Sequence, residues 1–211
     1  MTSPTDAAPL LPAVVLAAGE GRRFAAAGGA GPKVLALLDG RPLLAHVVDA
    51  AETAGLTPII VVVGPDVAAD PRLDAALADR PAARVIVNVR ADVGMGASLA
   101  TGLAHLDEDG SHDACVVLLG DQPGIDARVI ARVVATWRTT ARPIRACYDD
   151  GPSHPVLLPA GMWPSFADAT SKGARDALSE LDVAEVTVAG RSPRDVDRPI
   201  DLDALGGPDS R

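Results

Sequence analysis

Short apolar runs alternate along this chain with longer segments in which apolar residues recur at helical spacing. The short runs are rich in Val, Ile and Leu, as buried strands are. Strands that alternate with helices indicate a mainly parallel sheet with helices on both faces, an α/β fold of three layers. We predict six strands, at Ala13–Ala17, Ile59–Val63, Arg84–Val87, Ala114–Leu119, Ile144–Tyr148 and Glu185–Val188. We predict five helices, near Pro42–Ala54, Pro71–Ala78, Met95–Leu106, Asp126–Trp137 and Lys172–Leu181.

Three segments with polar or charged side chains follow predicted strands. A glycine-rich segment follows the first strand, Asn88 ends the third, and Asp121 follows the fourth. In open sheets of this class, ligands bind beyond the carboxyl ends of the strands. We therefore expect the three segments to meet at one edge of the sheet.

The glycine-rich segment, residues 18–33, carries Arg22, Arg23 and Lys33, and no acidic residue lies between Gly21 and Leu38. Glycine lets main-chain N–H groups turn toward an anion, and Arg and Lys supply the counter-charge. The whole chain has a formal charge of -9, so a basic stretch in it points to an anionic ligand. This combination suits a phosphate chain.

Two common phosphate-binding motifs do not explain this segment. A P-loop ends in Gly-Lys-Ser or Gly-Lys-Thr. Here Gly31 is followed by Pro32, Lys33 and Val34, so a P-loop is excluded. The dinucleotide fingerprint fits at two glycines, but Phe24 occupies its third glycine position and the expected ribose-binding acid is missing.

Length and composition limit the classes of protein. The 211 residues suffice for one domain, which we expect over residues 12–205 with flexible ends at 1–11 and 206–211. Acidic charge and only 2% aromatic residues argue against a nucleic-acid partner. The first residues lack a basic region of a signal peptide, and no apolar run approaches a membrane span, so we expect a cytoplasmic protein. Cys115 and Cys147 lie in strand-like runs without ligand spacing and are read as small buried hydrophobes.

Six segments, in order along the chain, carry a specific pattern. They are LAAGEGRRF (16–24) with PKVL (32–35), NVRADVGMGASLATGL (88–103), VVLLGDQPGI (116–125), SHPVL (153–157), KGAR (172–175) and DVDRPIDL (195–202). Together they resemble the nucleotidyltransferases that activate molybdopterin, and with Ala18, Gln122 and His154 they are most similar to the molybdenum cofactor cytidylyltransferase family. The resemblance implies a Rossmann-like, GT-A-like nucleotidyltransferase fold.

It also implies an activity: transfer of a nucleoside monophosphate, CMP from CTP, to a phosphorylated acceptor such as molybdopterin, with release of pyrophosphate. Arg23 and Lys33 would hold the triphosphate, whereas Arg22 is read as a solvated residue. Gln122 and His154 would contact the acceptor, and a molybdoenzyme would receive the product. The implied nucleotide-binding residues are Leu16, Ala17, Ala18, Gly19, Gly21, Arg23, Lys33, Asn88 and Ser98.

The chemistry needs a divalent cation rather than a general base, because a phosphate monoester is already anionic near neutral pH. Asp121, at the end of the most apolar strand, is the best candidate for a Mg²⁺ ligand, although an Asp before a proline also suits a plain turn. Asp195 and Asp197 alternate along an extended segment and face the same way. We favour Asp197 as the second ligand over an alternative in which this segment is a solvated acidic loop.

Several residues keep a structural alternative. Asn88 also suits a strand-end turn, Ser98 an exposed helical position, and His154 an incidental place in a loop. Two departures from the family pattern leave roles open: Ser171 replaces an acid, and residues 25–31 lengthen the loop as either a lid or a disordered spacer.

Other functions remain open as well. A guanylyltransferase or another small-molecule nucleotidyltransferase would keep the same fold. A nicotinamide-dependent oxidoreductase could use the turn at Gly19 and Gly21, and a non-catalytic cofactor chaperone would suit the replacement at Ser171.

Overall fold

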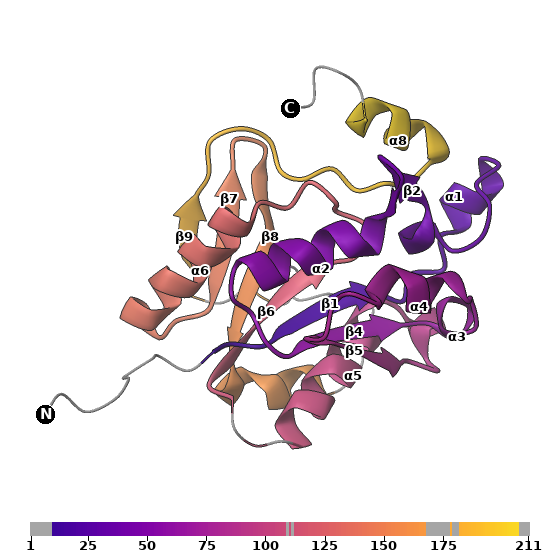
Figure 1. The fold of residues 1–211 in the computed structure, drawn as a ribbon. Coiled ribbons are helices and arrows are strands. Elements are labelled where there is room, and N and C mark those ends of the chain that lie inside the picture. The colour runs from indigo at the N-terminus through magenta and orange to yellow at the C-terminus, as the bar shows by residue number, and fades with distance from the viewer. Residues whose placement is uncertain (1–9, 109, 111, 168–177, 179–181, 207–211) are drawn as a thin grey trace, which may run out of the picture.

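The computed structural model describes residues 10–108, 110, 112–167, 178 and 182–206, and its centre is one twisted sheet (Figure 1). Within these residues, seven strands form the sheet in the order β5-β4-β1-β6-β8-β7-β9. Every neighbouring pair is parallel except the two pairs made by β8. The strands are β1 (Ala13–Ala17), β4 (Ile59–Val63), β5 (Ala83–Val87), β6 (Ala114–Leu119), β7 (Ile144–Tyr148), β8 (Gly151–Pro159) and β9 (Ala184–Thr187).

Helices cover both faces of this sheet, and the alternation of side chains along the strands explains why. In β1, Val15 packs with the core under α2 (Leu43–Thr53), α4 (Arg72–Leu77) and α6 (Ala127–Thr140). Its neighbours Val14 and Leu16 point to the other face, against α5 (Met95–Glu108) and the 3-10 helix η3 (Ala160–Phe166). A mainly parallel sheet with helices on both faces is thus confirmed, and the central strands β1, β4 and β6 are apolar throughout because both of their faces are buried.

Shorter elements surround the edge of the sheet at which the parallel strands end. They are α1 (Arg22–Ala26), η1 (Lys33–Leu35), the small hairpin β2 (Leu37–Leu38) and β3 (Arg41–Pro42), α3 (Pro65–Ala68), η2 (Ala91–Val93) and α8 (Pro199–Leu205). Figure 1 shows α1, β2 and α8 gathered at one end of the molecule. The last segment of the chain therefore returns to the first loop.

The sequence prediction is wrong about β8. We read residues 153–157 as a loop, but they lie in a nine-residue strand between β6 and β7. Three prolines argue against a strand in the sequence. The register shifts between Arg145 and Ala146 of β7, whose partners are Val156 and Ser153, so His154 and Pro155 occupy a bulge. Proline is tolerated there because a bulged residue makes no ladder hydrogen bond.

The remaining predicted elements agree with the structure to within a few residues, apart from one. The helix expected at Lys172–Leu181 falls almost wholly outside the described residues, as do Ser171, the KGAR segment and most of the expected flexible ends. Cys115 is fully buried as expected, whereas Cys147 is only partly buried. Among the helices that the structure describes, none has the length and hydropathy that crossing a membrane requires.

Candidate active site

The carboxyl ends of β1, β4, β5 and β6 lie side by side, because these four strands are parallel neighbours. The glycine-rich segment, Asn88 and Asp121 follow three of them, so the expected meeting at one edge is confirmed. A cavity of about 540 Å³ opens there. Most predicted nucleotide-site residues line it, namely Leu16, Ala17, Ala18, Gly19, Gly21, Arg23, Lys33 and Ser98, together with Asp121 and Asp197.

The glycine-rich segment folds sharply over this cavity. Gly21 has φ +61°, a left-handed conformation that favours glycine, and a Cβ there would lie 3.2 Å from Cβ of Lys33. The turn therefore holds Lys33 against the start of α1. Residues 25–31 are not the disordered spacer that we considered: Gly29 packs on the ring of Phe24, and its N–H donates to the Phe24 carbonyl at 2.9 Å.

Charged side chains form a cluster in this cavity. The Lys33 ammonium donates to Oδ2 of Asp121 at 2.6 Å and lies 3.5 Å from Oδ1 of Asp197. Arg23 donates to the other oxygen of Asp197 at 2.5 Å. The four residues that we predicted for triphosphate and cation are thus in direct contact, although 164 positions separate Lys33 from Asp197.

Backbone contacts position both carboxylates. Gly120 lets β6 approach β1 closely, because a Cβ at this position would lie 3.0 Å from Cβ of Ala17. The N–H of Val196 donates to the Asp121 carbonyl at 3.0 Å, which ties the C-terminal segment to the end of β6. The Asp201 carboxylate accepts from the N–H groups of Asp197 and Arg198 at 2.9 and 2.7 Å, as a cap for α8.

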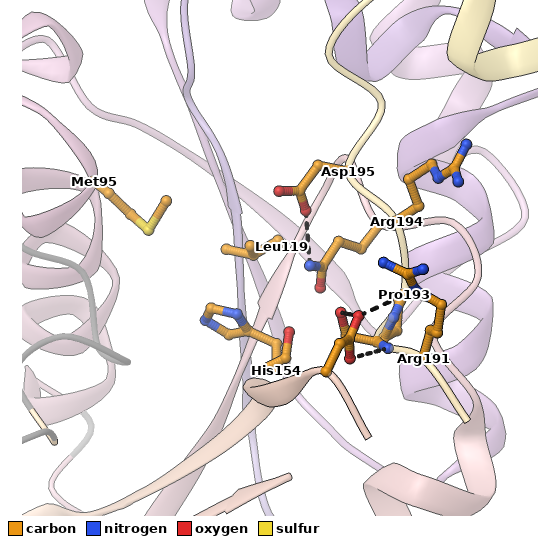
Figure 2. A pocket seen from close by; sticks show the side chains of 11 residues that line it. Met95, Leu119, His154, Arg191, Pro193, Arg194 and Asp195 are labelled. Carbon is orange, nitrogen blue, oxygen red and sulfur yellow. Dashed lines mark hydrogen bonds and ion pairs between the residues drawn. The ribbon is translucent and has the colours of Figure 1, made fainter. Parts of the chain in front are cut away.

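A second cavity, of about 360 Å³, adjoins the first (Figure 2). Met95, Leu119 and Asp195 line both cavities, so the two form neighbouring compartments. Gln122 and His154, predicted for the acceptor, both line the second one. Prediction from the sequence missed four other lining residues, Asp150, Arg191, Ser192 and Arg194. They follow the carboxyl ends of β7 and β9, so the rule that identified Asp121 also applies to them.

Gln122 and Asp195 form the wall between the compartments. The Gln122 amide nitrogen donates to Oδ1 of Asp195 at 2.8 Å, and the side-chain oxygen of Gln122 is buried without a hydrogen-bond partner among the described residues. Partial desolvation, and after it the negative charge of Asp121, raises the pKa of the Asp195 carboxyl above its usual value. The wall therefore presents hydrogen-bond acceptors to a ligand.

His154 is placed by β8 rather than by a loop, which corrects the alternative of an incidental loop residue. It is 3% exposed, and the Tyr148 hydroxyl donates to its carbonyl oxygen at 3.2 Å. Burial raises the pKa of Tyr148 to about 12, so this hydroxyl keeps its proton near neutral pH. Bulges are known to redirect a side chain next to a site, and His154 reaches the second cavity from such a bulge.

Asn88 and Ser98 are joined under the first cavity. The Asn88 amide nitrogen donates to the Ser98 hydroxyl at 3.1 Å, and its oxygen accepts from the N–H of Arg90 at 2.9 Å. Asn88 thus forms the strand-end turn that we had considered and is not among the residues lining the cavity. The alternative of an exposed Ser98 is wrong, because this residue is 4% exposed.

Comparison with known proteins gives a consistent family. The model of the MobA-like NTP transferase domain matches residues 13–186. Over 184 residues the chain is 33% identical to nicotine blue oxidoreductase of Paenarthrobacter nicotinovorans, covering 82% of this chain and 83% of that protein. Over 114 residues it is 36% identical to 3-deoxy-manno-octulosonate cytidylyltransferase of Rhodospirillum centenum, covering 53% of this chain but only 40% of that protein.

A solved structure shares nearly the whole fold. Rv0371c of Mycobacterium tuberculosis H37Rv superposes with a TM-score of 0.78 at 26% identity, covering 94% of this chain and 98% of that one. A structure of Rv0371c in complex with manganese gives a TM-score of 0.69, at 93% and 98% coverage and the same identity. Because the family model matches most of its length, the chain belongs to the MobA-like NTP transferase domain family.

Proposed function

We propose that this protein transfers CMP from CTP to a phosphorylated acceptor, molybdopterin or its molybdenum-loaded form, and releases pyrophosphate. The observation that carries the proposal is the pair of neighbouring cavities, which meet at Asp195 beside the Lys33–Asp121 pair. Such an arrangement suits two substrates that react at their common boundary. The product would pass to a molybdoenzyme, and the reaction would take place in the cytoplasm.

Lys33 and Arg23 would hold the triphosphate and neutralise the charge that develops as pyrophosphate leaves. Neither needs to act as a base, because the second pKa of a phosphate monoester is about 6 and the acceptor is already a dianion near neutral pH. Catalysis then depends on placing the two phosphates in line and on stabilising their charge. Lys33 and Arg23, which both line the first cavity, would supply that stabilisation.

The carboxylates of Asp121 and Asp197 fit a divalent cation. Both contact the same Lys33 ammonium, and Mg²⁺ in phosphate chemistry takes one or two carboxylates and fills its remaining positions with water and phosphate oxygens. No cluster of three or more His, Cys, Asp or Glu residues suited to a metal occurs in the described part of the chain. When bound, Mg²⁺ would supply charge neutralisation at the phosphates. That Rv0371c has been solved in complex with manganese supports a divalent cation in this proposal.

The second cavity would take the acceptor. The unpaired oxygen of Gln122 would accept a hydrogen bond from it, and buried His154 would contact it from β8. Arg191, which lies 3.6 Å from the Asp150 carboxylate, adds positive charge near an anionic substrate. These residues favour an acceptor that carries both a phosphate and hydrogen-bond donors.

Ala18 supports cytosine as the base. It is 5% exposed, lines the first cavity, and its carbonyl and Cα lie within 4.0 Å of where a Cβ of Gly64 would be. A methyl group at this position takes up room in the cavity, which would favour a pyrimidine over a purine. A cytidylyltransferase among the 36% identical relatives is consistent with this choice.

Pyrophosphate release tests the proposal directly. We expect release when CTP, Mg²⁺ and molybdopterin are supplied together, and background release when UTP, ATP or GTP replaces CTP. Release with GTP but not with CTP would favour a guanylyltransferase instead. No release with any of the nucleotides would contradict the transferase function.

One relative favours a second candidate, a nicotinamide-dependent oxidoreductase, because the protein that is 33% identical over most of both chains is named nicotine blue oxidoreductase. Against it, Phe24 occupies the third glycine position of the dinucleotide fingerprint. The absorbance of NADH or NADPH, measured in the presence of a dye acceptor, shows whether the cofactor is consumed and so separates the two candidates. Turnover there, together with no pyrophosphate release from CTP, would favour the oxidoreductase.

A further inference from the structure

The basic residues that line the first cavity are already paired with carboxylates. Lys33 contacts Asp121 and lies near Asp197, and Arg23 contacts Asp197. The two basic side chains proposed to bind the triphosphate thus pair with the two carboxylates proposed to bind the cation. The formal charges of these four residues cancel, and the two basic groups contact the carboxylate oxygens that a divalent cation would need.

The Lys33–Asp121 pair is the stronger of the two contacts. The Lys33 side chain is 10% exposed and that of Asp121 is 22% exposed, so solvent screens their attraction only partly. Arg23 and Asp197 are 75% and 43% exposed, and an ion pair as open as this contributes little. Lys33 is therefore the main competitor of a cation for the carboxylates.

We propose that Lys33, assisted by Arg23, closes the cation site in the absence of nucleotide, and that the triphosphate opens it. The phosphate oxygens attract Lys33 and Arg23 away from Asp121 and Asp197, and the released carboxylates then bind the cation. Nucleotide and cation consequently bind with positive coupling, and each raises the affinity for the other by the same factor. This inference rests on the proposed function, because it assigns the cluster to a triphosphate and a cation.

The test measures Mn²⁺ binding to the protein without nucleotide, from the electron paramagnetic resonance signal of the free ion. We expect weak binding to the wild type and binding about tenfold tighter to Lys33→Met, because the variant removes the competing ammonium. Arg128→Ala is the matched control, since Arg128 pairs with Asp126 at the start of α6 and lines neither cavity. It should leave Mn²⁺ affinity unchanged.

Two further variants keep the inference testable. Arg23→Ala frees Asp197 at an exposed position and should strengthen Mn²⁺ binding by a smaller factor, even if Lys33→Met fails to fold. The double variant Lys33→Met with Asp121→Asn should lose the gain, since the gained affinity belongs to Asp121. If Lys33→Met folds and binds Mn²⁺ no more tightly than the wild type, or Arg23→Ala binds it no more tightly where Lys33→Met does not fold, the inference is wrong.

Titration of the wild type with CTP in the presence of EDTA separates this inference from the proposed function. If the wild type binds CTP but the variants bind Mn²⁺ no more tightly than the wild type does, only the closure of the cation site by Lys33 is overturned. Absence of CTP binding with or without Mn²⁺ overturns the proposed function and, with it, the inference.

Discussion

At the scale of single residues, the site depends on contacts between distant parts of the sequence. Lys33 contacts one aspartate 88 positions away and lies near another 164 positions away. Its side chain reaches both because Gly21 turns the loop sharply and because β6 and the C-terminal segment end at the same place. A substitution in this cluster therefore affects chemistry more than folding.

Asp121→Ala should reduce pyrophosphate release to background while leaving the fold intact. A partly exposed carboxylate at the end of a strand adds little to the core, but its loss removes the main ligand proposed for the cation. Release from CTP and a urea unfolding curve measure the two effects. Asp79→Ala, in an exposed turn before β5, is the control, and near-normal release from Asp121→Ala would mean that the site has been misplaced.

Replacing Lys33 or Arg23 by Ala should weaken CTP binding by about 1.5 to 3 kcal/mol, the range for hydrogen bonds to charged groups. Isothermal titration with CTP in the presence of Mg²⁺ measures the loss. Arg128→Ala, which changes a residue outside both cavities, should bind nearly as the wild type does. Unchanged affinity in both Lys33→Ala and Arg23→Ala would show that the glycine-rich segment serves another ligand.

Ala18→Gly should relax the preference for CTP over GTP without inverting it. One methyl group in a pocket discriminates by about 1 to 3 kcal/mol, and removal of the Ala18 methyl should leave more room for a purine in the first cavity. Titration of both nucleotides against both proteins gives the ratio of affinities. Equal affinities in the wild type, or tighter binding of GTP, would contradict the choice of cytidine.

Much of this cluster could be predicted from residue types and their order. Arg23, Lys33 and Asp121 were identifiable because a basic, glycine-rich stretch and a carboxylate at a strand end have direct chemical meaning. The mutual pairing of the basic and acidic groups could not be predicted, because it depends on where the C-terminal segment returns. The contact of Asn88 with Ser98 could not be predicted either; the Asn88 side-chain amide donates to the Ser98 hydroxyl below the cavity.

At the scale of elements, the packing of β1 against β6 determines where Asp121 lies. The two strands are parallel neighbours, and the N–H of Gly120 donates to the Leu16 carbonyl at 2.9 Å. A Cβ at Gly120 would meet backbone atoms of Ala17 and Leu16, each at 3.3 Å, which cannot move aside as a flexible side chain would. The end of β6 consequently tolerates only glycine without a shift.

Gly120→Ala should cost about 1 to 3 kcal/mol of unfolding free energy, as overpacking does. It should also reduce turnover by up to about a hundredfold, because the neighbouring Asp121 moves with the strand end. Gly124→Ala, four positions further on, adds a Cβ that meets no atom within 4 Å and serves as the control. Wild-type turnover in Gly120→Ala would mean that the close approach of β1 and β6 is not needed.

The parallel strands β1, β4 and β6 were predictable because each is a continuous apolar run that is buried along nearly its whole length. The antiparallel β8 was not, because Pro152, Pro155 and Pro159 hide its strand character. It lies between β6 and β7 although it follows both in the sequence, an order that local periodicity does not contain. His154 was identified as a site residue all the same, but the strand that carries it was not.

At the scale of the whole molecule, the two cavities join regions that have different neighbours in the sheet. The first is lined partly by the carboxyl ends of β1 and β6, and the second partly by residues of β6 and β8. Binding in the first cavity should therefore stabilise the parallel half and, through Asp195 and Gln122, the wall that it shares with the second.

CTP with Mg²⁺ at 100 times its dissociation constant should raise the unfolding free energy by about 2.7 kcal/mol, as expected for a ligand that binds only the folded state. Urea unfolding gives this value, and the dependence of the free energy on urea concentration should stay the same. GTP at the same concentration should stabilise less. A midpoint that CTP does not move would show that CTP does not bind the folded protein.

The hydrogen bond between Val196 and Asp121 joins two segments that are synthesised at different times. Proteins leave the ribosome from the N-terminus at about 5 to 20 residues per second, so Asp197 emerges roughly 4 to 15 s after Asp121. During this interval Lys33 and Asp121 can meet, but the second carboxylate is still missing. A nascent chain therefore lacks one of the two carboxylates proposed for the cation until its C-terminal segment has been made.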